Sequence, residues 1–117
     1  DAKTAAGYLD LLVDLLLVRR LPPWHANVGK RLVKSPKVFV RDSGLLHALL
    51  AIADKEALSA HPVLGQSWEG FVVENLLACA PHGVDGYFYR SSGGAEIDLL
   101  LAWPDASSAG IAGRSRA

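Results

Sequence analysis

The stretch from Gly65 to Trp103 constrains the fold most, because its hydrophobic periodicity changes from helical to strand-like. The first part predicts a helix over residues 65–79, with an apolar stripe at three- and four-residue spacings made of Trp68, Phe71, Val72, Leu76 and Cys79. A turn region at 81–86 follows. The runs 87–90 and 96–103 then predict two strands of a hairpin, joined through Gly93-Gly94, which tolerate positive φ. A helix followed by a hairpin predicts an α/β fold.

The second strand of this hairpin carries two acids. Side chains alternate along a strand, so Glu96, Asp98 and Leu100 are expected on one face, with the two carboxylates roughly 6.5–7 Å apart at Cα. Two carboxylates beside Leu99-Leu100-Leu101 are costly to bury without compensation. The sequence leaves three sources of compensation open: a divalent cation, a basic partner or water.

Several short motifs carry a family resemblance. They are Gly65-x-x-x-Glu69 at the helix start, Tyr87-x-Tyr89-Arg90, Gly94-x-Glu96-Ile97-Asp98 followed by three leucines, and the upstream block Lys37–Leu46. Together they resemble DUF4143, the C-terminal domain of a widespread group of prokaryotic AAA-type ATPases. The resemblance covers most of residues 5–103.

The second half of that family is similar to the PD-(D/E)XK nuclease fold, which implies a set of site residues. In that fold a helix Glu, a strand Asp and a Glu-x-Lys on the next strand hold Mg²⁺ and activate water. By position, Glu69 or Glu74 matches the helix acid and Asp98 the strand acid. The two glutamates differ by about 140° around the helix, so only one can point at Asp98, and Glu69 is preferred. The resemblance thus implies Glu69, Asp98 and Glu96 as vestigial catalytic candidates, Glu69 and Asp98 as metal ligands, and Mg²⁺ as the cofactor of the full-length protein.

Two motifs that catalysis would need are missing. No Glu follows Glu96 and no Lys follows Lys55, so the Glu-x-Lys strand is absent. Gly29-Lys30 lacks the upstream glycine of a phosphate loop, because position 24 is Trp. We therefore expect no ATP site and no enzyme activity in this chain.

The charge pattern bears on partners and on location. Twelve basic and twelve acidic residues cancel, so no overall field attracts nucleic acid. A local basic segment runs from Arg19 to Arg41, and it is either a surface for nucleic acid or a solvated face. Cys79 is the only cysteine, which is compatible with a reducing, cytoplasmic setting. Charges interrupt the leucine-rich start, so no membrane span is expected.

The beginning of the chain predicts a helix over 4–16 that is buried on most of its sides, since its apolar residues leave only one polar line. An edge strand over 17–21, stopped by Pro22-Pro23, and a returning strand over 30–34 would follow. A helix with such a hairpin is similar to the last part of a winged helix. Next come a short strand over 37–41, a helix capped by Asp42 and a polar connector over 54–62.

The sequence therefore predicts an α/β chain in three parts: a winged-helix-like helix plus hairpin at 1–36, a truncated restriction-endonuclease-like core at 37–104, and an irregular tail at 105–117. Its predicted role is that of a non-catalytic C-terminal domain of a DUF4143-type AAA ATPase that recognises a protein or nucleic-acid partner. The alternatives are a Mg²⁺-dependent nuclease and an oligomerisation module. The expected partners include the upstream ATPase domain and a second copy of the chain. Self-association would occur through an open sheet edge around Leu99, Leu101 and Trp103.

Overall fold

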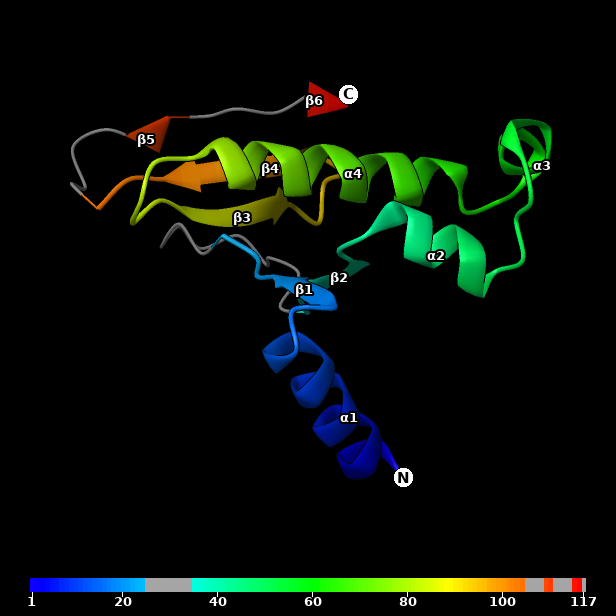
Figure 1. Ribbon diagram of the computed structural model, residues 1–117. Helices are drawn as coiled ribbons and strands as arrows, with labels where there is room; N and C mark the ends of the chain where they lie inside the picture. Colours follow the sequence, from blue (N-terminus) through cyan, green and yellow to red (C-terminus); the bar gives the residue numbers. More distant parts are fainter. Residues whose placement is uncertain (25–34, 105–108, 111–114, 117) are drawn as a thin grey trace. The chain divides into compact units, whose positions relative to one another are not determined.

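The computed structural model describes residues 1–24, 35–104, 109–110 and 115–116 (Figure 1). The chain contains both helices and strands, as the sequence predicts, and the returning strand expected over 30–34 lies outside the described residues. The elements are α1 (Ala2–Asp14), β1 (Val18–Leu21), β2 (Lys37–Val40), α2 (Ser43–Leu49), α3 (Lys55–Ala60), α4 (Leu64–Cys79), β3 (Asp85–Arg90), β4 (Glu96–Ala102), β5 (Ala109–Gly110) and β6 (Ser115–Arg116).

Aspartates begin three of the helices. Asp42 accepts a hydrogen bond from the Leu45 amide at 3.0 Å, which confirms the predicted cap of α2. Asp54 accepts one from the Ala57 amide at 2.8 Å and starts α3, so the expectation of a polar connector over 54–62 is wrong. The cap satisfies an amide that the first helical turn leaves without a partner, which allows even this short polar segment to be helical.

The chain divides into two compact units that are interleaved along the sequence. The first comprises Asp1–Arg20 and Val38–Asn75, and the second comprises Leu21–Lys37 and Leu76–Ala117. β1 and β2 pair in a two-stranded sheet, and the boundary between the units falls within both strands. The predicted domains are consecutive instead, and their boundaries stay predictions.

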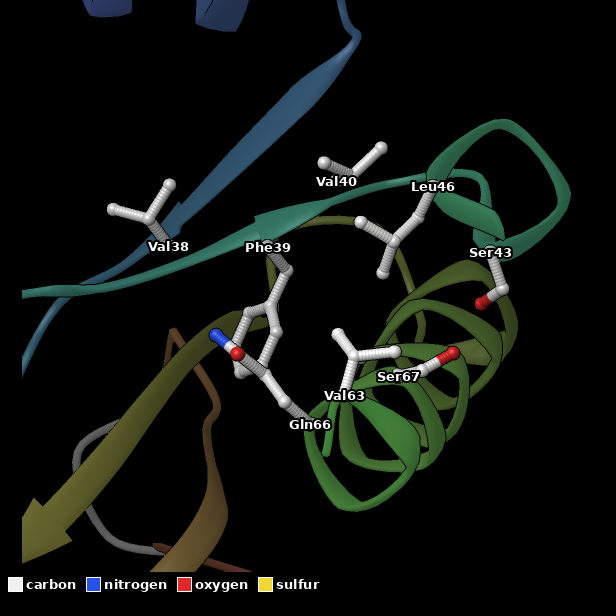
Figure 2. Close-up of a pocket in the computed structure, with 9 residues that line it drawn as sticks. Val38, Phe39, Val40, Ser43, Leu46, Val63, Gln66 and Ser67 are labelled. Atoms are coloured by element: carbon white, nitrogen blue, oxygen red, sulfur yellow. The ribbon is translucent and has the colours of Figure 1, made fainter. Parts of the chain in front are cut away.

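In the first unit, small residues of α4 pack against β2. Phe39 and Val73 are buried, and a Cβ at Gly70 would lie 3.1 Å from Cδ1 of Phe39. Figure 2 shows the side chain of Phe39 beside a cavity of about 120 Å³ that residues of β2, α2 and α4 line. The buried face of α4 is thus Ser67, Gly70 and Val73 rather than the apolar stripe of the sequence.

The apolar side of α1 is exposed. We expected a helix buried on most sides, and this expectation is wrong because no residue of α1 is buried. The exposed residues include Tyr8, Leu11, Leu12 and Leu15. In the part of the chain that the structure describes, no helix is long and apolar enough to cross a membrane.

The second unit is built on the predicted hairpin. β3 and β4 pair antiparallel, with Arg90 opposite Glu96 and Tyr87 opposite Leu100. The register shifts between Tyr87 and Tyr89, which places one extra residue on β4. Three consecutive leucines of β4, Leu99, Leu100 and Leu101, are all buried, so this end of the strand is buried on both of its faces.

Backbone segments lie along both sides of the hairpin. The Phe88 amide donates to the Pro22 carbonyl at 3.0 Å, and the Trp24 amide donates to the Phe88 carbonyl at 2.7 Å. β5 and β6 pair antiparallel with β4, so the tail contains strands where we expected irregular chain. Leu99 and Leu101 are buried and β4 has strand partners on both sides, so the expected open edge is wrong for these two residues, whereas Trp103 is exposed as expected.

Candidate functional site

A cluster of two acids and two bases lies at the start of β4 in the second unit. Lys37 Nζ donates to Glu96 Oε1 at 3.0 Å and lies 3.6 Å from Asp98 Oδ1. Arg90 donates to the same Glu96 oxygen at 2.8 Å. The sequence leaves open whether a divalent cation, a basic partner or water compensates the charge of the two acids. The structure shows a basic partner.

Lys37 is held in place by its surroundings. It is the first residue of β2, its side chain is 16% exposed, and its Nζ lies 5.2 Å from the centre of the Phe88 ring. A cation over an aromatic face is attracted by the negative electron density of the ring. The ammonium group therefore binds to the acids on one side and to a buried aromatic residue on another.

The charges around Glu96 affect its protonation. The hydrogen bond from Arg90, and then that from Lys37, hold the pKa of the Glu96 carboxyl below its ordinary value of 4.5, against a smaller opposing effect of burial. Both bases stabilise the ionised form. Glu96 is thus a carboxylate near neutral pH.

As placed, these acids do not fit a Mg²⁺ site. Mg²⁺ needs oxygen ligands in octahedral geometry, whereas both carboxylates here face an ammonium group that repels a cation. No group of three or more His, Cys, Asp or Glu side chains among the described residues is arranged to hold a metal ion.

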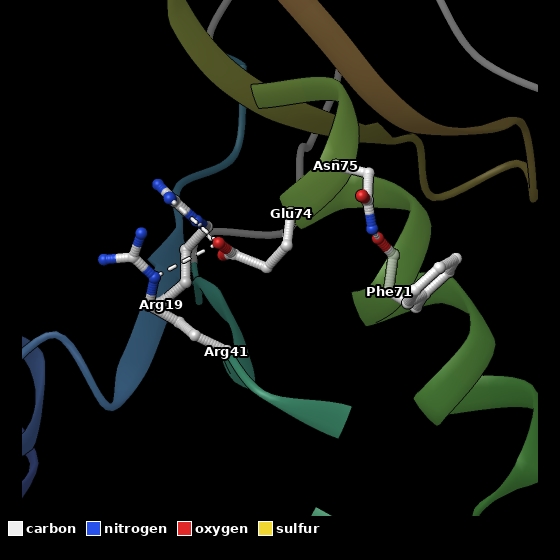
Figure 3. A network of polar contacts seen from close by, with 5 residues as sticks. All are labelled: Arg19, Arg41, Phe71, Glu74 and Asn75. Carbon is white, nitrogen blue, oxygen red and sulfur yellow. Dashed lines mark hydrogen bonds and ion pairs between the residues drawn. The ribbon is translucent and has the colours of Figure 1, made fainter. Parts of the chain in front are cut away.

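Glu69 and Glu74, the two acids that the sequence predicts on the helix, belong to the first unit. The cluster around Glu96 belongs to the second unit. Glu69 is partly exposed on α4. Glu74 binds two arginines: Arg19 through Nε and, at 3.3 Å, through Nη2, and Arg41 through Nε at 3.1 Å (Figure 3). The roles predicted for Glu69, Asp98 and Glu96 as a catalytic set stay predictions, and so does Glu74 as the alternative helix acid.

The described arginines of the basic segment are paired with acids. Arg19 and Arg41 bind Glu74, and Arg20 donates to Asp10 at 2.8 Å. Lys30, Arg31 and Lys34 lie outside the described residues. Where the segment is described, its charges are therefore largely neutralised.

One feature has no signal in the sequence. His47 of α2 and Ser67 of α4 form a 2.6 Å hydrogen bond at a groove of about 310 Å³ in the first unit. Leu58, Leu64, Trp68 and Phe71 also line this groove. No motif joins His47 to Ser67, because the contact depends on how α2 packs against α4.

Two families match successive parts of the chain. Residues 1–56 match DUF8612 and residues 64–112 match DUF4143, each a domain of unknown function. The block Lys37–Leu46 falls within the first match, so the DUF4143 region begins later than the resemblance suggested. It also extends into the tail beyond residue 105.

Two mycobacterial proteins are similar to this chain. They are the uncharacterized proteins Rv2008c of Mycobacterium tuberculosis and Mb2031c of Mycobacterium bovis, each 55% identical over 99 residues. The match covers 84% of this chain but 22% of either relative, so the chain spans about a fifth of their length. No solved structure matches the chain. Residues 64–112, which match the DUF4143 family, contain α4 and the hairpin of β3 and β4.

Proposed function

We propose that this chain is a non-catalytic, protein-binding part of a longer protein, whose ATPase activity, as the family resemblance implies, resides in another domain. The observation that carries the proposal is the pairing of Glu96 and Asp98 with Lys37, reinforced by Arg90. These acids are the strongest catalytic candidates of the sequence. Bound in this way, they stabilise the second unit.

The chemistry of the cluster supports this role. Lys37 and Arg90 are donors without acceptor capacity, and together they offset the charge of both carboxylates. A metal ion would have to displace Lys37 from a position that it also holds against Phe88. The charge of the two carboxylates is already balanced by Lys37. Exchanging Lys37 for Mg²⁺, which gives up its water reluctantly, would therefore stabilise them little further.

The surface favours a protein over a nucleic acid as the partner. Specific and non-specific binding of nucleic acid both depend on basic side chains that can neutralise phosphates. Here Arg19, Arg20 and Arg41 are bound to carboxylates. In contrast, the first unit exposes large apolar side chains on α1 and α4, which are typical of protein contacts.

Fluorescence anisotropy with a labelled DNA duplex tests the choice of partner. At physiological salt we expect binding no tighter than about 10⁻⁴–10⁻⁶ M, the range of non-specific association. The matched variant is Arg20→Gln, which should change this weak binding little because Arg20 already pairs with Asp10. Nanomolar, salt-sensitive binding that Arg20→Gln weakens would refute the proposal of a protein partner.

The alternative is a Mg²⁺-dependent nuclease, and one observation favours it. Lys37 lies 3.6 Å from Asp98, so it could supply the positive group that the missing Glu-x-Lys strand would otherwise bring. This alternative predicts cleavage of DNA that depends on Asp98.

A further inference from the structure

The two segments that match different families carry opposite charge. The first segment, residues 1–56, contains nine lysines and arginines against six acids. The second segment, residues 64–112, contains one arginine against six acids. The near-neutral chain is thus made of a basic first segment and an acidic second one. Complementary charge attracts the right partner and suppresses contacts with like-charged surfaces.

In the first compact unit, an acid of the second segment binds two bases of the first segment. Glu74 pairs with both Arg19 and Arg41, and its side chain is 15% exposed (Figure 3). Water screens such partly buried pairs less than it screens exposed ones. An apolar contact accompanies them, because Phe39 is buried and a Cβ at Gly70 would lie 3.1 Å from its Cδ1.

The second compact unit joins the two segments in the same way. Lys37 of the first segment lies 3.0 Å from Glu96 Oε1 of the second. Phe88 of the second segment is 1% exposed, and its amide and carbonyl bond to the backbone of Pro22 and Trp24 at 3.0 and 2.7 Å. Each compact unit is therefore built from both segments, with the bases on one and most of the acids on the other.

The first segment has a small core of its own. Among the residues that the structure describes, its buried apolar side chains are Val18, Leu21 and Phe39. A short segment folds alone only where the apolar surface that it buries offsets the loss of conformational entropy. The first segment therefore depends on the second for much of its stability.

We propose that the second segment is the binding partner of the first, that apolar contacts hold the two together, and that opposite charge selects the pairing. The surface that receives the first segment consists of α4 and the hairpin of β3 and β4, with Glu74 and Glu96 as its charged anchors. This inference does not depend on the proposed protein-binding role, since both partners lie in one chain. It assigns Arg19, Lys37 and Arg41 to an acidic protein surface, whereas Arg20 pairs within its own segment.

Cleavage of the folded, complete chain tests the proposal. A protease recognition sequence is inserted between Ala60 and His61, in the stretch that separates the two family matches. The purified protein is cut and then analysed by size-exclusion chromatography. We expect the two pieces to elute together at physiological salt. Their dissociation constant, measured by sedimentation equilibrium, should rise with salt because salt screens the ion pairs.

Charge reversals test whether the ion pairs select the partner. Glu74→Lys and Lys37→Glu should each raise the dissociation constant of the cut chain about tenfold, which corresponds to about 1.4 kcal/mol. The matched controls are Asp85→Lys and Lys55→Glu, which make the same changes of charge at exposed positions outside these ion pairs. Both controls should leave the constant nearly unchanged. Circular dichroism before the cut checks folding, and Glu74→Gln and Lys37→Met replace a variant that does not fold.

Two results would overturn this inference. Wild-type pieces that separate at physiological salt would show that the second segment does not bind the first, whether or not the pieces stay folded. Equal dissociation constants for Glu74→Lys and Asp85→Lys would show that the ion pairs do not select the partner.

Discussion

At the residue scale, the ammonium group of Lys37 balances the charge of two carboxylates. It is 3.0 Å from Glu96 and 3.6 Å from Asp98, and Arg90 approaches Glu96 from the neighbouring strand at 2.8 Å. Such a counter-charge stabilises a partly buried pair of acids. The cluster can therefore be interpreted as part of the stability of the second unit.

Replacing Lys37 tests this interpretation. Lys37→Met keeps the length of the side chain but removes its charge, so we expect a loss of about 1–2 kcal/mol in the free energy of unfolding, between the values for exposed and buried pairs. Urea denaturation followed by circular dichroism measures it. Lys37→Arg keeps the charge and should lose less. Unchanged stability of Lys37→Met would contradict a structural role for the cluster.

The lowered pKa of Glu96 predicts a pH dependence of stability. Its pKa in the folded chain lies below 4.5, so in the unfolded chain it binds protons more readily. The stabilisation by the ionised Glu96 is thus fully present above pH 4.5 and is lost as the pH falls through the folded value. Glu96→Gln should remove this component, so that the stabilities of wild type and variant converge on acidification. A difference that is independent of pH would count against the assignment.

The contacts of this cluster are only partly predictable from the sequence. Arg90 and Glu96 face each other because a short hairpin fixes its own register. Lys37 is far from Glu96 along the chain, and no local pattern joins them. The burial of Leu100 beside Leu99 and Leu101 is also not predicted by an alternation of buried and exposed faces.

At the element scale, α4 is buried through small residues and exposed through large ones. Gly70 allows Phe39 to approach the helix, whereas Trp68 and Phe71 remain outside. The hydrophobic pattern predicts that α4 is a helix, but not which of its faces is buried, because Gly and Ser contribute little to such a pattern. The same reasoning failed for α1, whose leucines predict burial and are exposed.

Glu74 joins α4 to β1 and to the residue that follows β2. Its carboxylate is 15% exposed and binds both Arg19 and Arg41. Glu74→Gln should lower the free energy of unfolding by about 1–2 kcal/mol, since two partly buried guanidinium groups lose their counter-charge. Glu56→Gln, at an exposed position of α3, is the control and should have a smaller effect in the same thermal or urea unfolding experiment. Equal effects of the two variants would show that the arginine contacts are not stabilising.

At the scale of the whole molecule, the α/β class and most of the elements follow from the sequence, but the division into units does not. The families match successive segments, 1–56 and 64–112, whereas the compact units are interleaved along the chain. Such an arrangement depends on contacts between distant segments, such as those of Pro22 and Trp24 with Phe88, which local periodicity cannot reveal.

The central claim is that the acids of β4 are not catalytic, and a plasmid-nicking assay tests it most directly. The chain and its Asp98→Ala variant are each incubated with supercoiled plasmid in Mg²⁺ or Mn²⁺, with EDTA as the metal-free control. Because Lys37 and Arg90 bind these carboxylates, we predict no metal-dependent nicking by either protein. Metal-dependent nicking by the wild-type chain that disappears in Asp98→Ala would contradict the account.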